Sequence, residues 1–164
     1  MILEPWHFSW TVSDLEKSVV FYTELLGFEL VHEQVQQNAY TEKLVGYAGA
    51  HLKVAMLKLP GHHPGMSGHM LELLEYVSPK GETYTEGTNH VLAAHLALCT
   101  DNIHAQHDRL SQAGVKFVSE PVALTAGRNA GGYACYFRDP DGFTLELLQP
   151  PASVLSSARV GETA

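Results

Sequence analysis

Two near copies of one short sequence occur in the chain, and this internal repeat limits the possible folds more than any other feature. The copies are residues 68–74 (GHMLELL) and 142–148 (GFTLELL), and in each a glycine precedes by four positions a glutamate flanked by leucines. Because side chains alternate along a strand, Glu72 and Glu146 each face away from their leucines. If both faces of the strand are covered, each carboxylate must be paired, hydrogen-bonded or bound to a metal ion. The alternative is an edge strand whose glutamate faces water.

The first half of the chain predicts a strand, a helix and three more strands. Alternation in residues 6–12 predicts a strand with His7 on its less apolar face. Ser13 followed three positions later by Glu16 predicts a helix that begins there, and Gly27 ends it. The three further strands are predicted at residues 28–34, 52–59 and 70–76. Residues 36–49 leave two alternatives open, a helical turn at 40–45 or a mobile loop.

The second half repeats this order. Residues 94–99 predict a strand that carries His95, Asp101 is the expected helix N-cap, and Gly114 ends the helix. Strands are predicted at residues 115–121, 133–137 and 143–149. The turn at residues 139–142 (DPDG) has the residue types of a tight hairpin.

Equivalent positions near the start of the two halves have nearly constant separations in sequence: His7 and His95 are 88 positions apart, and Gly27 and Gly114 are 87 apart. Glu72 and Glu146 are 74 apart, which one shorter loop in the second half explains. We therefore predict an α+β protein of two tandem βαβββ modules that form a barrel-like, cupped mixed sheet with helices outside. The predicted domains are a first module at 1–77, a linker at 78–90, a second module at 91–150 and a tail at 151–164, frayed or packed only in part.

Composition excludes several function classes. The 10 lysines and arginines are outnumbered by 18 acidic residues, and no basic run occurs, so nucleic acid and anionic membrane surfaces are poor partners. The N-terminus lacks the features of a signal peptide, and no apolar run approaches the length of a membrane span. We therefore expect a cytoplasmic protein in which Cys99 and Cys135 are buried free thiols.

Each half contributes one histidine on its first strand and one glutamate on its fourth. If the two sheets face each other, His7, Glu72, His95 and Glu146 converge. Two imidazoles and two carboxylates suit divalent Zn, Ni, Co, Mn or Fe, and the two carboxylates balance the charge of the ion. We predict one divalent metal ion per site.

The chain resembles the vicinal oxygen chelate superfamily, which includes glyoxalase I, methylmalonyl-CoA epimerase, extradiol dioxygenases and bleomycin-resistance proteins. The resemblance rests on four stretches: His7 with residues 13–15, 21–22 and 26–28, then residues 71–73, then residues 95–98 with 100–102, and then residues 139–142 leading into 145–147. The ligand order His7, Glu72, His95, Glu146 is similar to that of glyoxalase I. The epimerase branch commonly has glutamine at the place of Glu72.

This resemblance implies a metal-dependent isomerase or lyase of the glyoxalase or epimerase type. Such an enzyme abstracts a proton next to a metal-bound carbonyl of a small substrate, with Glu146 or Glu72 as the catalytic base. Two alternatives stay open. An extradiol ring-cleaving dioxygenase would use Fe(II) and leave Glu72 off the metal, and a drug-binding or resistance protein would need no metal. We also expect a homodimer, because two open sheets leave edges to cover.

Other residues carry weaker signals. Arg128, in a glycine-rich loop, is a candidate clamp for a substrate carboxylate, and His51 is a candidate substrate-binding residue at the cavity mouth. Three further groups of residues have both a functional and a purely structural interpretation. A second metal site or a solvated loop is possible for His62, His63 and His69. His104 and His107 are expected on a helix surface or rim, and Tyr40 and Glu42 lie either at the pocket or on a surface loop.

Overall fold

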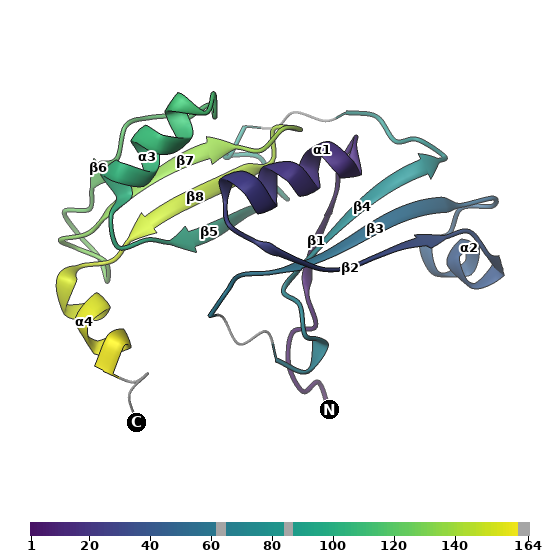
Figure 1. Cartoon of the computed structure of the whole chain (residues 1–164), viewed down its shortest axis with the longest axis horizontal. Coiled ribbons are helices and arrows are strands. Elements are labelled where there is room, and N and C mark those ends of the chain that lie inside the picture. Colours follow the sequence, from purple (N-terminus) through teal and green to yellow (C-terminus); the bar gives the residue numbers. More distant parts are fainter. Residues whose placement is uncertain (62–64, 84–86, 161–164) are drawn as a thin grey trace. The chain divides into compact units, whose positions relative to one another are not determined.

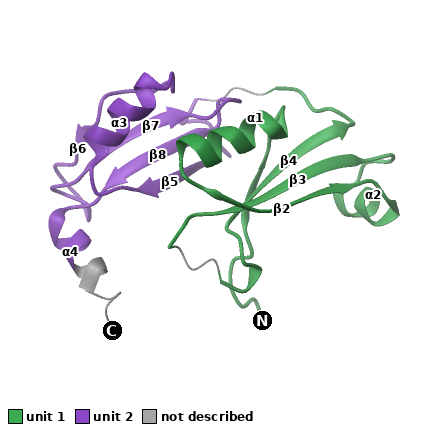
Figure 2. Ribbon diagram, in the orientation of Figure 1, with its two compact units in different colours: residues 1–84 green, residues 85–164 purple. Residues whose placement is uncertain are grey.

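Two compact units make up the protein. The computed structural model describes residues 1–61, 65–83 and 87–160, and the chain divides into Met1–Tyr84 and Thr85–Ala164 (Figures 1 and 2). The division falls inside the segment 78–90 assigned to a linker, while the predicted domain boundaries themselves remain a prediction. None of the described helices is long and apolar enough to cross a membrane.

The two units share one strand–helix–three-strand order, which confirms the α+β prediction. The elements of the first unit are β1 (Phe8–Thr11), α1 (Leu15–Val20), the π-helical turn η1 (Phe21–Leu25), β2 (Glu29–Gln36), α2 (Ala39–Val45), β3 (His51–Lys58), the 3-10 turn η2 (Gly65–Ser67) and β4 (Leu71–Ser78). Those of the second unit are β5 (His95–Cys99), α3 (Ile103–Gln112), β6 (Val122–Ala123), β7 (Tyr133–Arg138), β8 (Thr144–Gln149) and α4 (Ala152–Val160).

Each unit holds one open, four-stranded mixed sheet. The strand orders are β1-β4-β3-β2 and β5-β8-β7-β6, so the first strand of each unit pairs in parallel with the last (Figure 1). Ser9 is the partner of Glu72 in one parallel ladder, and Ala97 is the partner of Glu146 in the other. Since Ser9 and Ala97 are also 88 positions apart, the two ladders have the same register.

The first helix begins one residue later than predicted. Asp14, and not Ser13, is the N-cap of α1, and its carboxylate accepts the backbone N–H of Lys17. The N–H of Leu15 is donated to Glu75 on β4 at 2.9 Å. This contact with a strand distant in sequence fixes Leu15 as the first helical residue, which explains why a local capping signal misplaced the start.

The second unit repeats this arrangement. Asn102, and not Asp101, caps α3, and the N–H of Ile103 is donated to Gln149 on β8 at 2.8 Å. Glu75 and Gln149 each stand three positions after the glutamate of the repeat. Both helices are therefore tied at their N-termini to the strand that carries that glutamate.

One predicted strand is largely absent. Residues 115–121 form only a bridge between Phe117 and Phe137, while the short strand β6 begins after Pro121. Val118 still donates to the carbonyl of Tyr136 at 2.8 Å. Proline has no N–H to donate, so the ladder to β7 is interrupted before it resumes at Val122.

Two helices lie in segments whose sequences have no clear periodicity. Residues 36–49 contain α2, which Asn38 caps and which ends at Gly46 in the left-handed conformation. Residues 152–160 form α4, which corrects the expectation of a frayed tail. The carbonyl of Pro151 accepts N–H groups from Val154 and Leu155 and so starts this helix.

The two faces of each sheet differ as the alternation predicts. Leu71, Leu73 and Leu145 are fully buried, and Leu147 is 5% exposed. In the first unit Trp10 packs on the buried ring of Tyr22 with ring centroids 5.9 Å apart. The glutamates of the repeat lie on the opposite, more open faces.

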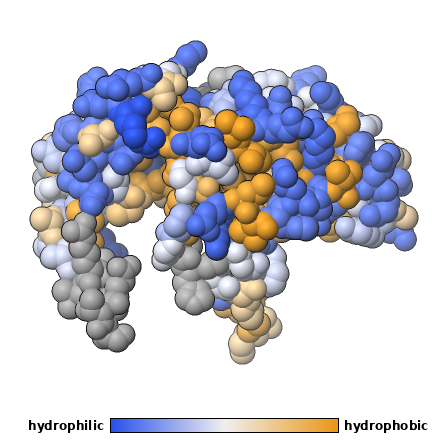
Figure 3. All heavy atoms as spheres, viewed as in Figure 1, coloured by the Kyte–Doolittle hydropathy of each residue, from blue (hydrophilic) through white to orange (hydrophobic). Residues whose placement is uncertain are grey.

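Large apolar side chains also reach the surface of the first unit. Figure 3 shows apolar groups among polar ones in the region of α1 and β2. The exposed residues there include Val20, Leu30, Val31 and Val35. Trp6 and Phe8 are more than half exposed, whereas Trp10 is half-buried.

The hairpin turn before β8 depends on one buried carboxylate, that of Asp139. Its Oδ1 accepts the N–H of Asp141 at 3.0 Å and that of Phe143 at 2.8 Å. We predict that Asp139→Ala lowers the free energy of unfolding by about 1–3 kcal/mol, because these backbone donors lose their acceptor. Asp139→Asn keeps an acceptor oxygen and should lose less than half as much. Urea denaturation of both variants checks this, and equal losses would contradict it.

The two cysteines differ in accessibility. Cys135 is buried as predicted, whereas Cys99 is exposed, so the prediction of a buried thiol was wrong for Cys99. Burial, with smaller contributions from Glu120 and Glu146, raises the pKa of the Cys135 thiol to about 11. Because the thiolate is the reactive form, we predict that a thiol reagent at neutral pH labels native Cys99 well before Cys135. Mass spectrometry of peptides after timed labelling measures this, with Cys135→Ser as control. Equal labelling rates in the native protein would be the contrary result.

Candidate functional site

The first unit brings His7 next to Glu72. His7 lies just before β1, two residues ahead of Ser9, the ladder partner of Glu72. Its Nε2 atom is 3.4 Å from Oε2 of Glu72. The side chains are 28% and 15% exposed, so the pair is half-buried but reachable from solvent.

The second unit brings His95 next to Glu146 in the same way. His95 is the first residue of β5 and lies two residues ahead of Ala97, the partner of Glu146. Its Nε2 atom is 3.2 Å from Oε2 of Glu146. The ring of His95 meets that of Tyr136 edge-on, at a centroid distance of 5.5 Å. The repeat thus produces the same His–Glu pair twice.

The atoms of both pairs are spaced like neighbouring ligands of one metal ion. A nitrogen and an oxygen each bound at about 2.0–2.2 Å, at angles of about 90–110°, are about 2.8–3.6 Å apart. An imidazole nitrogen without hydrogen and a carboxylate oxygen are both acceptors. A proton or a cation must therefore lie between them, and the donor set fits a divalent metal.

Neither pair forms a complete metal site by itself. Among the described residues, no group of three or more His, Cys, Asp or Glu side chains is placed to hold an ion. The structure thus shows His7 with Glu72 and His95 with Glu146. The four-ligand set, and the catalytic roles of Glu72 and Glu146, stay predictions.

His69 is a partner of His7 that the sequence analysis did not identify. The alternative of a solvated loop residue is wrong for His69, because its side chain is 4% exposed and its Nε2 is 3.1 Å from Nδ1 of His7. The repeat offered a signal, because His69 occupies the position of Phe143 in the second copy, three residues before the glutamate. His62 and His63 lie outside the described residues.

The two predicted substrate-binding residues occur in different units. Arg128 is exposed, on the loop between β6 and β7. His51 is half-buried at the start of β3, where it pairs with Ser78. Neither placement tests substrate binding, so both assignments stay predictions.

The remaining histidines and loop candidates have plain structural surroundings. His104 is exposed on α3, whereas His107 is buried, with its ring 4.3 Å from that of Phe117. The predicted surface or rim position was therefore wrong for His107, because its side of α3 faces the core. Tyr40 and Glu42 belong to α2.

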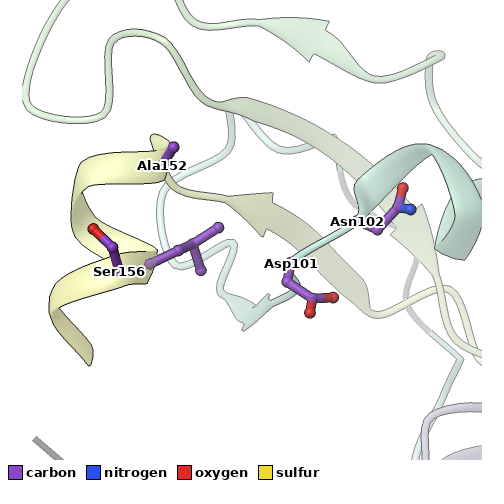
Figure 4. A pocket seen from close by; sticks show the side chains of 5 residues that line it. Asp101, Asn102, Ala152 and Ser156 are labelled. Atoms are coloured by element: carbon purple, nitrogen blue, oxygen red, sulfur yellow. The ribbon is translucent and has the colours of Figure 1, made fainter. Parts of the chain in front are cut away.

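A pocket in the second unit lies beside α4 and not at a His–Glu pair. It has a volume of about 680 Å³ and is lined by Asp101, Asn102, Ala152, Leu155 and Ser156 (Figure 4). Most of these residues are exposed, so the pocket is shallow. It contains none of the predicted ligands.

Comparisons with known proteins find relatives that cover most of the chain, and a solved structure with the same fold. A 2-epi-5-epi-valiolone epimerase from an Actinomyces species is 35% identical over 150 residues, which are 89% of this chain and 79% of that protein. A probable lactoylglutathione lyase from Vibrio parahaemolyticus is 32% identical over 139 residues, 84% of each chain. The fold matches that of a glyoxalase family protein from Bacillus cereus, with a TM-score of 0.76 at 20% identity over 93% of this chain and 97% of the other.

The sequence profile of one family spans both modules. It matches residues 6–147, from the residue before His7 to the residue after Glu146. The chain belongs to the glyoxalase/bleomycin resistance protein/dioxygenase superfamily.

Proposed function

We propose that this protein is a metal-dependent isomerase or lyase that moves a proton at a carbon next to a carbonyl group of a small substrate. The observation that carries the proposal is the pair of matching half-sites, each with a histidine Nε2 and a glutamate Oε2 at 3.2–3.4 Å. The relatives named epimerase and lactoylglutathione lyase support this class of reaction.

The proposed ligands of the ion are His7, Glu72, His95 and Glu146. The ion would be Zn, Ni, Co, Mn or Fe in the divalent state, and when bound it would polarise the substrate carbonyl as a Lewis acid. Two carboxylates balance its charge, which lowers the cost of burying the four side chains. The four ligands come either from one chain or from two copies in a homodimer.

A glutamate of the site would serve as the base. In both pairs the carboxylate oxygen that contacts the histidine is Oε2, and in the described part of the chain no hydrogen bond to Oε1 of Glu72 or Glu146 is present. Oε1 can therefore accept a proton from a substrate carbon and return it to the same or the opposite face. Return to the opposite face gives epimerisation, and return to a neighbouring carbon gives isomerisation.

Two substrate classes follow from the relatives. The relative with 35% identity favours an epimerase that acts on a cyclitol ketone such as 2-epi-5-epi-valiolone. The lyase relatives favour the glutathione hemithioacetal of a 2-oxoaldehyde, which is converted to a thioester of lactoylglutathione type. Arg128 would be the clamp for a carboxylate of glutathione, and His51 would contact the substrate at the mouth of the site.

Metal content tests the ligand set. We predict about one divalent ion per four-ligand site in wild-type protein purified without a His tag. In Glu72→Gln and in Glu146→Gln the metal affinity should be at least about tenfold weaker, because a neutral amide replaces a charged ligand. Glu33→Gln, on the exposed strand β2, is the matched control. Elemental analysis with chelator competition measures both quantities. Iron retained in full by Glu72→Gln would favour the dioxygenase, and no metal after reconstitution would leave a binding protein.

Deuterium exchange tests the reaction. In D₂O the loaded enzyme should exchange a proton next to the carbonyl of 2-epi-5-epi-valiolone or of lactoylglutathione, and NMR identifies the carbon. Replacing the base by glutamine should slow exchange by about 100- to 10,000-fold. Exchange with one substrate and not the other assigns the class. Oxygen uptake with a catechol, without exchange into either compound, would refute the proposal.

A further inference from the structure

We propose that His69 is a positioning residue that fixes the tautomer and the ring orientation of His7. His69 would hold the hydrogen of His7 on Nδ1 and so keep the lone pair of Nε2 directed at the side where Glu72 lies. The effect on metal affinity rests on the proposed function, but the tautomer of His7 can be measured without metal.

The hydrogen bonds around His69 have only one consistent direction when both rings are neutral. Nδ1 of His69 is 3.0 Å from the backbone carbonyl oxygen of Ser67, which can only accept, so Nδ1 of His69 must donate. A neutral imidazole has one donor and one acceptor, so Nε2 of His69 accepts. Its partner at 3.1 Å, Nδ1 of His7, must then be the donor.

This direction has a consequence at Nε2 of His7. With its hydrogen on Nδ1, neutral His7 has no hydrogen on Nε2, and that nitrogen faces Oε2 of Glu72 at 3.4 Å. Two acceptors thus face each other, an arrangement that a cation between them stabilises. His69 therefore prepares His7 to bind an ion before the ion arrives.

His69 is itself held rigidly. It is 4% exposed, and its ring lies 5.2 Å from that of His7 between centroids, at an interplanar angle of 39°. The hydroxyl of Ser67 donates to the carbonyl of His69 at 2.6 Å, and the turn passes through Gly68 at φ +73°, which favours glycine. A buried imidazole fixed by its neighbours can orient a second ring.

The second module lacks this device. At the position equivalent to His69 it has Phe143, which offers no ring nitrogen. The ring of His95 instead makes an edge-on contact with that of Tyr136. The two modules thus support their histidines differently, by a hydrogen bond in one and by an aromatic contact in the other.

The tautomer is measured by long-range proton–nitrogen NMR on metal-free protein at about pH 8.5, above the ordinary imidazole pKa of about 6.5. We expect the Nδ1–H form for His7 in the wild type. His69→Gln keeps an acceptor near the place of Nε2 and should preserve that form. The shorter side chain of His69→Asn can reach the carbonyl of Ser67 but not Nδ1 of His7, so this variant should lose the Nδ1–H form of His7. An Nε2–H tautomer in the wild type, or an unchanged tautomer in the asparagine variant, would overturn the inference.

Metal affinity provides the second readout. Loss of a partner behind a ligating histidine weakens metal binding by about 10- to 100-fold. We expect this loss in His69→Asn and in His69→Phe, which copies the second module, and near wild-type affinity in His69→Gln. His104→Gln, on the exposed side of α3, is the control, and thermal melts verify that each variant folds. Equal affinity in the asparagine and glutamine variants would refute a positioning role.

The two proposals can fail separately. If wild-type protein binds no metal but His7 holds its hydrogen on Nδ1 through His69, the proposed function fails and the positioning role stands. If metal binds but the tautomer does not depend on His69, the positioning role fails and the proposed function stands.

Discussion

The parallel pairing of the first and last strands of each module is the interaction on which the rest of the structure depends. It places Ser9 opposite Glu72 and Ala97 opposite Glu146, and in each case a histidine two residues earlier reaches the glutamate. The same last strands supply Glu75 and Gln149, which hold the N-termini of α1 and α3. One pair of strands thus positions both the helix and the ligand pair of its module.

Much of this was predictable because it follows from alternation and from the repeat. The faces of His7, Glu72, His95 and Glu146 needed only a strand period of two, and the repeated element order with its two copies of one short sequence identified their counterparts. Details that depend on distant contacts were missed. The predicted helix starts were each one residue early, because Glu75 and Gln149 on another strand determine them. Residues 115–121 were predicted as a strand from local propensity, but Pro121 interrupts the ladder to β7 and they form only a bridge.

His69 shows why a site is harder to predict than a fold. A histidine after a glycine- and proline-rich segment resembles a solvated loop residue, and only the turn at Gly68 and the contact with Ser67 bring it into the interior. Its polar role also breaks the symmetry of the repeat, since the second copy has Phe143 there. A residue that differs between the two copies of a duplicated module indicates a role that is specific to one of them.

The strand order has a further consequence for how the protein is made. The β2–β3–β4 and β6–β7–β8 meanders join neighbours in sequence, whereas Ser9 meets Glu72 across 63 positions and Ala97 meets Glu146 across 49. Closing the longer loop has the larger entropic cost. A nascent module that has formed only its meander therefore holds no His–Glu pair. On the ribosome, the first module can acquire its pair only after β4 has emerged, so ligand assembly is coupled to completion of each module.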